Sequence, residues 1–123
     1  MTTILIVDDD ELIGEALGEE LVEEGFSALY ASSADEGMDI VLSRPIDIML
    51  LDLKMPGKDG FYVLRKLREL DLPIKVIILS AYADVKSAVE AAQLGAAEFF
   101  HKPFDFTELI NTIKKLSAVE PAV

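Results

Sequence analysis

Two short apolar runs that end in carboxylates constrain the fold of this chain most strongly. Residues 4–7 (ILIV) lead into three aspartates at 8–10, and residues 48–51 (IMLL) lead into Asp52. A wholly apolar run of four residues bounded by polar ones is typical of a strand buried on both faces, as in a parallel sheet. Open parallel sheets bind ligands outside the carboxyl ends of their strands. The acids therefore fall where such a fold forms its site.

The rest of the chain predicts strands that alternate with helices. Alternation of this kind calls for a parallel sheet covered by helices on both faces. We therefore expect an α/β fold, a flavodoxin-like doubly wound (βα)5 domain with a five-stranded parallel sheet in the order 2-1-3-4-5. The predicted strands cover residues 4–7, 27–31, 46–51, 76–79 and 98–100, and the predicted helices cover residues 11–24, 34–44, 61–70, 84–94 and 105–116.

Helical spacing of apolar residues predicts which face of each helix is buried. Gly25 and Gly95 are expected helix stops, and Ser33 with Glu36 forms an expected capping box. The predicted inward residues are Leu12, Ala16, Leu17 and Leu21; Met38, Val41 and Leu42; Phe61, Leu64 and Leu67; Val85, Ala88, Val89 and Ala92; and Leu109, Ile110, Ile113 and Leu116.

Length and composition narrow the class of protein. A chain of 123 residues, 51% of them hydrophobic, is expected to form one domain over residues 1–117, with residues 118–123 as a flexible tail or the start of a linker. A net charge of −12 argues against direct contact with nucleic acid and favours cations or basic partners. There is no cysteine, no signal-peptide pattern and no membrane-length apolar run, so a cytoplasmic protein is expected.

Four of the five predicted strands end in a charged or hydroxyl-bearing residue: Asp8 and Asp9, Asp52, Ser80 and Lys102. In the expected strand order the three acids converge, and Ser80 and Lys102 approach from the other side. Clustered carboxylates ionise together when a cation neutralises them, and Mg²⁺ prefers oxygen ligands. A carboxylate can also attack phosphorus to give an aspartyl phosphate. The residues therefore predict a Mg²⁺-dependent phosphoryl-transfer site.

Each of these residues has a simpler explanation when it is taken alone. Acids are favoured at a helix N-terminus, which accounts for residues 8–11. Asp52 could end a strand in a turn, Ser80 could cap a helix, and Lys102 could be a solvated side chain. Their joint placement at strand ends is what favours a site.

The motifs resemble the receiver domain of two-component response regulators. They are Asp8-Asp9, residues 51–60 (LDLKMPGKDG), residues 79–81 (LSA) and residues 102–104 (KPF), in the order of that family and within a similarity that covers roughly residues 3–117. The resemblance implies that Asp52 is the phosphoacceptor and that Mg²⁺ is the cofactor. It further implies that Asp9 binds Mg²⁺ directly, Asp8 binds it through water, and the backbone carbonyl of Lys54 completes the protein ligands.

The resemblance also implies that Ser80 and Lys102 contact the phosphoryl group and that Phe99 is the switch aromatic. Two positions depart from the commonest family pattern. Ser80 replaces threonine, which keeps the hydroxyl, and Phe99 replaces tyrosine, which removes an outward hydrogen bond. We expect neither change to prevent phosphorylation. The second change argues against a switching mechanism that needs a phenol hydroxyl.

The implied partners are a sensor histidine kinase or phosphotransfer protein upstream, and an effector domain or target protein downstream. A phosphorylation-dependent homodimer is a further candidate. The domain is expected to catalyse its own phosphorylation and dephosphorylation and no other reaction. Residues 81–93 and 102–105 look like receivers of sigma-54-dependent activators, whereas Lys54 and Tyr82 resemble the single-domain sporulation relay type. A standalone protein and a fragment of a longer regulator both stay open.

Two other classes of protein fit this sequence less well. The pattern Asp8-x-Asp10 resembles haloacid-dehalogenase-like phosphohydrolases, but this chain is too short for their cap and that reading leaves Asp52 without a role. A flavodoxin-like FMN carrier needs a hydroxyl- and glycine-rich loop after the first strand, and an acidic loop there repels phosphate.

Overall fold

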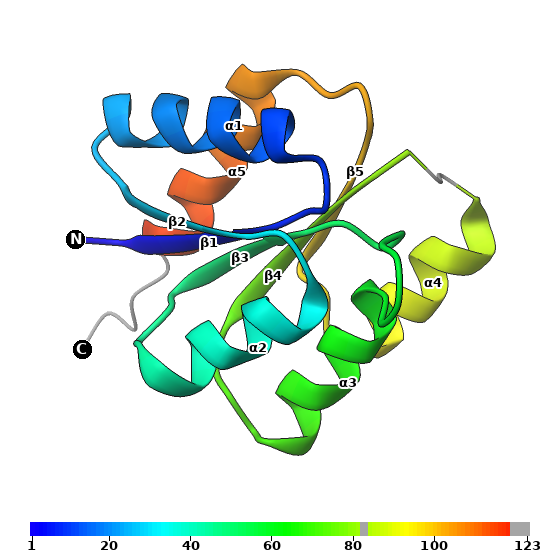
Figure 1. Cartoon of the computed structure of the whole chain (residues 1–123). Coiled ribbons are helices and arrows are strands. Elements are labelled where there is room, and N and C mark those ends of the chain that lie inside the picture. Colours follow the sequence, from blue (N-terminus) through cyan, green and yellow to red (C-terminus); the bar gives the residue numbers. More distant parts are fainter. Residues whose placement is uncertain (82–83, 119–123) are drawn as a thin grey trace.

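Five parallel strands form the middle layer of the structure, in the order β2-β1-β3-β4-β5 (Figure 1). The computed structural model describes residues 1–81 and 84–118. Helices α1 and α5 lie on one face of the sheet, and α2, α3 and α4 lie on the other (Figure 1). The elements are β1 (Thr3–Val7), α1 (Glu11–Glu23), β2 (Ser27–Ala31), α2 (Ala34–Ser43), β3 (Ile48–Leu51), α3 (Gly60–Glu69), β4 (Lys75–Ser80), α4 (Val85–Gln93), β5 (Glu98–His101) and α5 (Phe106–Ala118).

The predicted fold class and strand order are confirmed. Residues 4–7 of β1 show why this run is apolar throughout, since their successive side chains enter two different cores. Leu5 and Val7 join the cluster under α2 and α3, whereas Ile4 and Ile6 join the cluster under α1 and α5. A strand that faces helices on both sides has no solvent-facing position, so the two-residue alternation of an amphipathic strand disappears.

Short polar side chains fix where the helices begin. The carboxylates of Asp10, Asp59 and Asp84 accept hydrogen bonds from backbone N–H groups in the first turns of α1, α3 and α4. Ser33 does the same for α2, as predicted. These caps satisfy donors that have no partner inside the helix. Gly25 and Gly95 have φ values of +94° and +101°, the left-handed conformation that favours glycine after a helix.

Several predicted inward residues are instead exposed, and these predictions are wrong. Leu12 is 79% exposed, Leu42 64% and Val85 78%, and Ala16, Val89 and Ala92 are also exposed. Small residues that the prediction left out are buried: Gly14 in α1, Ala34 and Gly37 in α2, and Ala91 in α4. The predicted Leu17, Leu21, Met38 and Val41 are buried as expected. The helical count therefore ranked strongly apolar residues too high and small residues too low.

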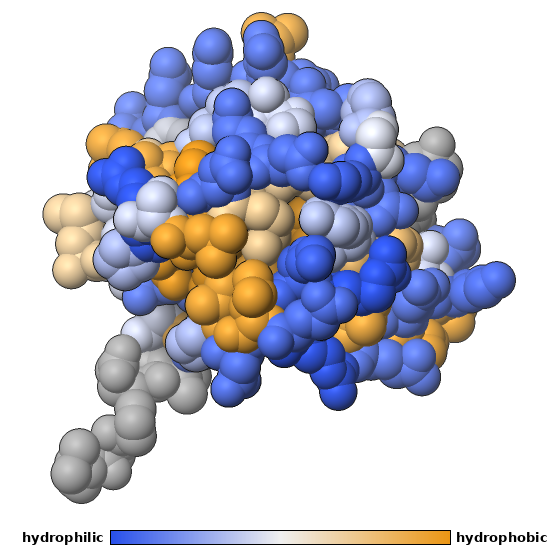
Figure 2. All heavy atoms as spheres, turned by 60° about the horizontal axis from the view of Figure 1, so that its bottom comes forward, coloured by the Kyte–Doolittle hydropathy of each residue, from blue (hydrophilic) through white to orange (hydrophobic). Residues whose placement is uncertain are grey.

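Some exposed apolar side chains lie on the α2–α3 face of the molecule. Figure 2 shows this face as mostly hydrophilic, with apolar patches between the charged side chains. Leu42 of α2 and Leu70, which follows α3, are exposed apolar residues of these elements. Single exposed apolar residues are ordinary on a protein surface and need no partner to explain them.

Most predicted boundaries shift by one or two residues, and two of these shifts affect other predictions. The third strand begins at Ile48 and not at residue 46; Ile46 is buried, although it precedes the strand. Helix α5 continues to Ala118, one residue into the expected tail. The other tail residues, 119–123, lie outside the described part of the chain. Within the described residues, no helix is both long enough and apolar enough to cross a membrane.

Replacing Gly60 with alanine should destabilise the protein. A Cβ at Gly60 would lie 2.5 Å from the backbone oxygen of Asp52 and 2.8 Å from the Cα of Leu53, and neither backbone atom can move easily. We expect Gly60→Ala to lower the free energy of unfolding by about 2 kcal/mol, as overpacking does. The matched control is Gly18→Ala, where the nearest atom is 4.0 Å away and alanine should raise stability by roughly 0.5–1 kcal/mol. Urea unfolding of both variants tests this; equal stability changes would contradict it.

Candidate functional site

Three carboxylates meet at the carboxyl ends of two neighbouring strands. Asp8 and Asp9 follow β1, Asp52 follows β3, and the last residues of these strands, Val7 and Leu51, are paired in register. One oxygen from each of the three acids lies within 4.8 Å of the others. Asp8 and Asp52 are buried, whereas Asp9 is exposed. We call these three residues the acidic pocket.

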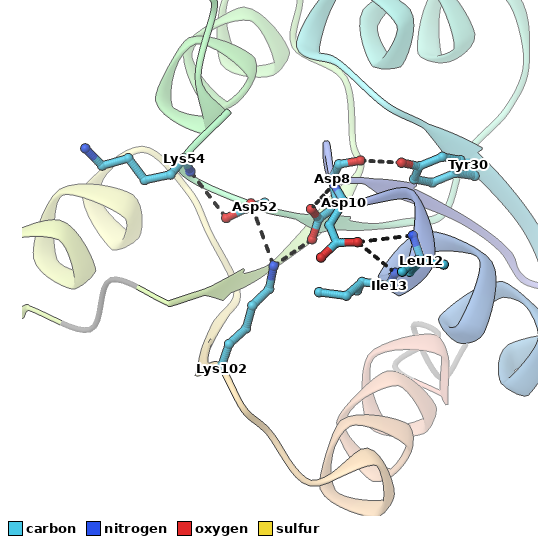
Figure 3. A network of polar contacts seen from close by, with 8 residues as sticks. All are labelled: Asp8, Asp10, Leu12, Ile13, Tyr30, Asp52, Lys54 and Lys102. Carbon is cyan, nitrogen blue, oxygen red and sulfur yellow. Dashed lines mark hydrogen bonds and ion pairs between the residues drawn. The ribbon is translucent and has the colours of Figure 1, made fainter. Parts of the chain in front are cut away.

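Lys102 reaches the acidic pocket from the loop after β5 (Figure 3). Its Nζ donates a hydrogen bond to Asp8 Oδ2 at 2.7 Å and lies 3.7 Å from Asp52 Oδ2. The side chain of Lys102 is only 15% exposed, so its charge is held in place. Its backbone N–H donates to the carbonyl of Ser80 at 2.8 Å, which ties the β5 loop to the end of β4. The sequence predicted that these strand ends converge, and the structure places them so.

The Asp52 carboxyl is held in an environment that disfavours its charge. Burial is the largest influence and raises its pKa above the ordinary value of 3.8; the nearby Asp8 and Asp9 charges act in the same direction. Lys102 and the backbone N–H of Lys54, 3.3 Å from Asp52 Oδ1, oppose this rise. A raised pKa means that the negative charge of the carboxylate is poorly compensated by its surroundings, so its oxygens bind a proton more readily than usual. Such a group is suited to accept either a cation or an electrophile.

Asp52→Asn should therefore stabilise the metal-free protein at neutral pH. Because the pKa is raised on folding, the contribution of Asp52 to stability is fully present below its unfolded-state pKa and is lost as the pH rises through its folded-state pKa. We expect a gain on the order of 1 kcal/mol at pH 7, as found when a buried charge becomes a neutral group of similar volume. The gain should shrink toward pH 4.

Urea unfolding in the presence of a chelator measures this gain at each pH. Asp39→Asn is the control, since Asp39 is exposed on α2 and should show little change. A variant at position 52 that is less stable than wild type at pH 7 would show that Lys102 outweighs burial.

The acidic pocket fits a hard divalent cation. Its donors are carboxylate oxygens, which Mg²⁺ prefers, and the exposed position of Asp9 leaves room for the water ligands that Mg²⁺ retains. Three carboxylates and the Lys102 ammonium leave two negative charges, which one divalent ion would balance. Asp10 does not belong to this set. Its carboxylate caps α1 through Leu12 and Ile13 (Figure 3).

The other predicted site residues lie around the acidic pocket. Ser80 ends β4 and is fully buried, in register with His101 of β5. Phe99 of β5 is half-buried and packs against the core cluster under α2 and α3. Lys54 is exposed, and its side chain points away from Asp52 (Figure 3). Its backbone carbonyl stays a predicted ligand. Tyr82, which resembles the single-domain sporulation relay type, lies outside the described residues.

Sequence reasoning missed one residue at the site, Tyr30. Its hydroxyl donates to the backbone carbonyl of Asp8 at 2.6 Å (Figure 3). The signal was available, because β2 neighbours β1 in the predicted strand order and Tyr30 lies in register with Ile6, two residues before Asp8. A tyrosine near the end of a strand beside the acids was a candidate to reach them.

A family model and the curated relatives of this chain point to the same protein family. A family model described as "Response regulator receiver domain" matches residues 4–114. Sporulation initiation phosphotransferase F of Bacillus subtilis is 39% identical over 112 residues, which are 91% of this chain and 90% of that protein. The DNA-binding transcriptional regulator NtrC of Klebsiella pneumoniae is 34% identical over 110 residues, which are 89% of this chain but 24% of that protein.

A solved structure of the same family also resembles this chain. The response regulator protein TrrA from Thermotoga maritima, determined in complex with Mg(2+)-BeF, is 37% identical with a TM-score of 0.85, and the match covers 94% of this chain and 99% of that one. This chain spans about half the length of several other curated relatives, which are named as transcriptional regulatory proteins. The similarity therefore includes both a relative of nearly the same length and proteins that continue well beyond it.

Proposed function

This chain belongs to the response regulator receiver domain family, and on that premise we propose that it is a phosphorylation switch whose phosphoacceptor is Asp52. The observation that carries the proposal is the position of Asp52: buried at the end of β3, beside two further carboxylates and 3.7 Å from the Lys102 ammonium. The family match favours this function over the haloacid-dehalogenase-like alternative.

The proposed reaction transfers a phosphoryl group from a phosphohistidine to Asp52. One oxygen of Asp52 forms the new P–O bond, and the P–N bond of the donor breaks, so that its imidazole leaves and takes a proton from solvent. Phosphoryl transfer depends mainly on positioning and charge neutralisation. The Lys54 N–H fixes one oxygen of Asp52, and Lys102 supplies positive charge beside the other.

Asp8, Asp9 and Asp52 would hold Mg²⁺, with the carbonyl of Lys54 as a further ligand. When bound, the ion would supply the positive charge that brings a negatively charged phosphoryl donor to an acidic surface. The residues of the chain have separate tasks: Asp8 also anchors Lys102, and Asp52 presents its carboxylate toward the pocket.

The proposed output runs from Ser80 and Phe99 to the surface of α4, β5 and α5. Ser80 is connected to the β5 loop because its carbonyl accepts the Lys102 N–H. Phe99 borders a surface pocket of about 180 Å³ beside α4 that is lined mainly by alanines, so small side chains surround this part of its ring. A phosphoryl group that draws the Ser80 hydroxyl toward it would favour the conformer in which the Phe99 ring turns inward. The result is a population shift of a two-state element.

The distribution of charge supports a basic partner at the phosphorylation site. Residues 1–43 contain twelve acidic side chains and no lysine or arginine, whereas the rest of the chain contains eleven of each sign. The whole net charge therefore belongs to the half of the domain built from β1, α1, β2 and α2. A sensor kinase or phosphotransfer protein with a basic surface would be steered to this half, with a strong dependence on salt. The cytoplasm stays the predicted compartment.

The proposed function is tested by phosphorylating the protein with a small donor. Wild-type protein should gain one phosphoryl group from acetyl phosphate in the presence of Mg²⁺ and none in the presence of EDTA. Hydroxylamine should release the group, since it cleaves acyl phosphates. Intact-protein mass spectrometry measures both steps. A modification that resists hydroxylamine would point to a hydroxyl such as Ser80 and contradict the proposal.

Lys102→Ala should bind Mg²⁺ at least as well as wild type but fail to switch. The ammonium is a competing cation at Asp8, so its loss leaves the acidic pocket free for the ion. It is also the link from the pocket to the β5 loop. Addition of beryllofluoride, a phosphoryl mimic, should therefore shift the amides of α4 and β5 in wild type and not in the variant, as NMR can show. The control is Lys114→Ala, whose exposed ion pair with Glu24 is far from the pocket. Wild-type shifts in Lys102→Ala would remove the coupling role.

A further inference from the structure

Strand β2 holds both backbone groups of Asp8. The N–H of Asp8 donates to the carbonyl of Ala31 at 3.1 Å, which continues the ladder between β1 and β2. The carbonyl of Asp8 accepts from the Tyr30 hydroxyl at 2.6 Å, which is a side-chain contact and no part of the ladder (Figure 3). A short hydrogen bond from a phenol therefore fixes a peptide group where regular strand pairing has ended.

The ring of Tyr30 is itself fixed by α1. Gly14 lies directly beneath the ring, and a Cβ on Gly14 would overlap the Tyr30 Cε1, Cδ1 and Cζ atoms. Gly14 is buried although it lies within a helix, where glycine lowers stability relative to alanine. The glycine thus makes room for an aromatic ring whose hydroxyl reaches the loop between β1 and α1.

The acceptor of this hydrogen bond belongs to the peptide that links Asp8 to Asp9. Fixing the plane of this peptide sets the direction in which the chain leaves β1, and so the position of Asp9. Asp8 is also held through its side chain, by the Asp10 N–H at 2.9 Å and by Lys102. Asp9 is exposed, so its position depends more on the backbone that carries it.

We propose that Tyr30 is a positioning residue for the acidic pocket: its hydroxyl orients the Asp8–Asp9 peptide so that both carboxylates face Asp52 and bind a divalent cation together. Burial, followed by the charge of Asp8 and the other nearby acids, raises the pKa of Tyr30 to about 12, so the hydroxyl keeps its proton and stays a donor. This inference rests on the Mg²⁺ site of the proposed function and adds to it a residue on β2.

The test is the variant Tyr30→Phe, which removes the hydroxyl and keeps the ring above Gly14. We expect its Mg²⁺ affinity to fall about tenfold, the effect of losing a group that orients a metal ligand. At saturating Mg²⁺ the rate of phosphorylation by acetyl phosphate should stay within about twofold of wild type. The metal-free protein should also show displaced amide resonances for Asp9 and Asp10. The control is Tyr62→Phe on α3, whose ring lies near Lys58 and Lys66.

Isothermal titration calorimetry gives the affinities, and NMR gives the amide shifts. Unchanged Mg²⁺ affinity in Tyr30→Phe, with or without a loss of thermal stability, overturns the inference and leaves Tyr30 a packing residue. An equal loss in Tyr62→Phe overturns it as well. A wild-type protein that binds no Mg²⁺ overturns the proposed function and this inference together, so the two failures are distinguishable.

Discussion

Replacing Asp52 with asparagine should abolish phosphorylation of this domain. Asparagine has nearly the shape of aspartate, so the fold and the contacts of Asp8 with Lys102 should persist. Its amide nitrogen has no lone pair available to attack phosphorus, and its oxygen lacks the negative charge of a carboxylate. Asp8 and Asp9 cannot replace it, because Asp8 is paired with Lys102 at 2.7 Å and Asp9 lies on the exposed side of the pocket. We expect labelling to fall at least a hundredfold, the scale on which loss of a catalytic nucleophile acts.

Incubation with acetyl phosphate and Mg²⁺, followed by mass spectrometry of borohydride-trapped peptides, measures this loss. The matched control is Asp59→Asn. Asp59 lies seven residues away and caps α3 by accepting the Tyr62 N–H, a role that asparagine fills equally well. That variant should be labelled like wild type. Undiminished labelling of Asp52→Asn would mean that another side chain accepts the phosphoryl group.

The fold could be predicted from the sequence because its strongest signals are local. Residues 4–7 of β1 and all of β3 are apolar, and a run of this kind has few alternatives to a buried parallel strand. Their carboxyl-terminal acids converge for a topological reason, since parallel strands end at the same edge. Asp8, Asp9 and Asp52 follow from that rule without knowledge of any contact distance.

The missed features depend on contacts between segments far apart in the sequence. Leu12 is exposed because helix α1 turns Gly14 toward the sheet, and Gly14 is buried because Tyr30 packs against it. The helical count could not foresee this, since it ranks leucine above glycine as a core residue. The hydrogen bond from Tyr30 to Asp8 joins residues 22 positions apart. The predicted strand order places Tyr30 beside the acids, but it does not specify that the hydroxyl donates to a backbone carbonyl.

Asp9→Asn should weaken Mg²⁺ binding far more than Asp10→Asn, although both changes remove one negative charge from adjacent residues. Asp9 contributes an oxygen to the acidic pocket, whereas the carboxylate of Asp10 accepts the Leu12 and Ile13 N–H groups at the start of α1. Asparagine is as good a helix cap as aspartate, so Asp10→Asn keeps the local structure. Loss of a ligand should lower Mg²⁺ affinity by roughly tenfold or more, in line with the strict geometry of this ion.

The smaller effect of Asp10→Asn should come from long-range attraction alone. It should be under about threefold at low salt and should fade at physiological ionic strength, where exposed charges about 8 Å or more apart are screened. The loss in Asp9→Asn should persist at both salt concentrations, because a missing ligand cannot be screened. Calorimetric titrations at two salt concentrations separate these cases. Equal, salt-dependent losses in the two variants would mean that the acids attract the ion as a diffuse field, and that Asp9 is no ligand.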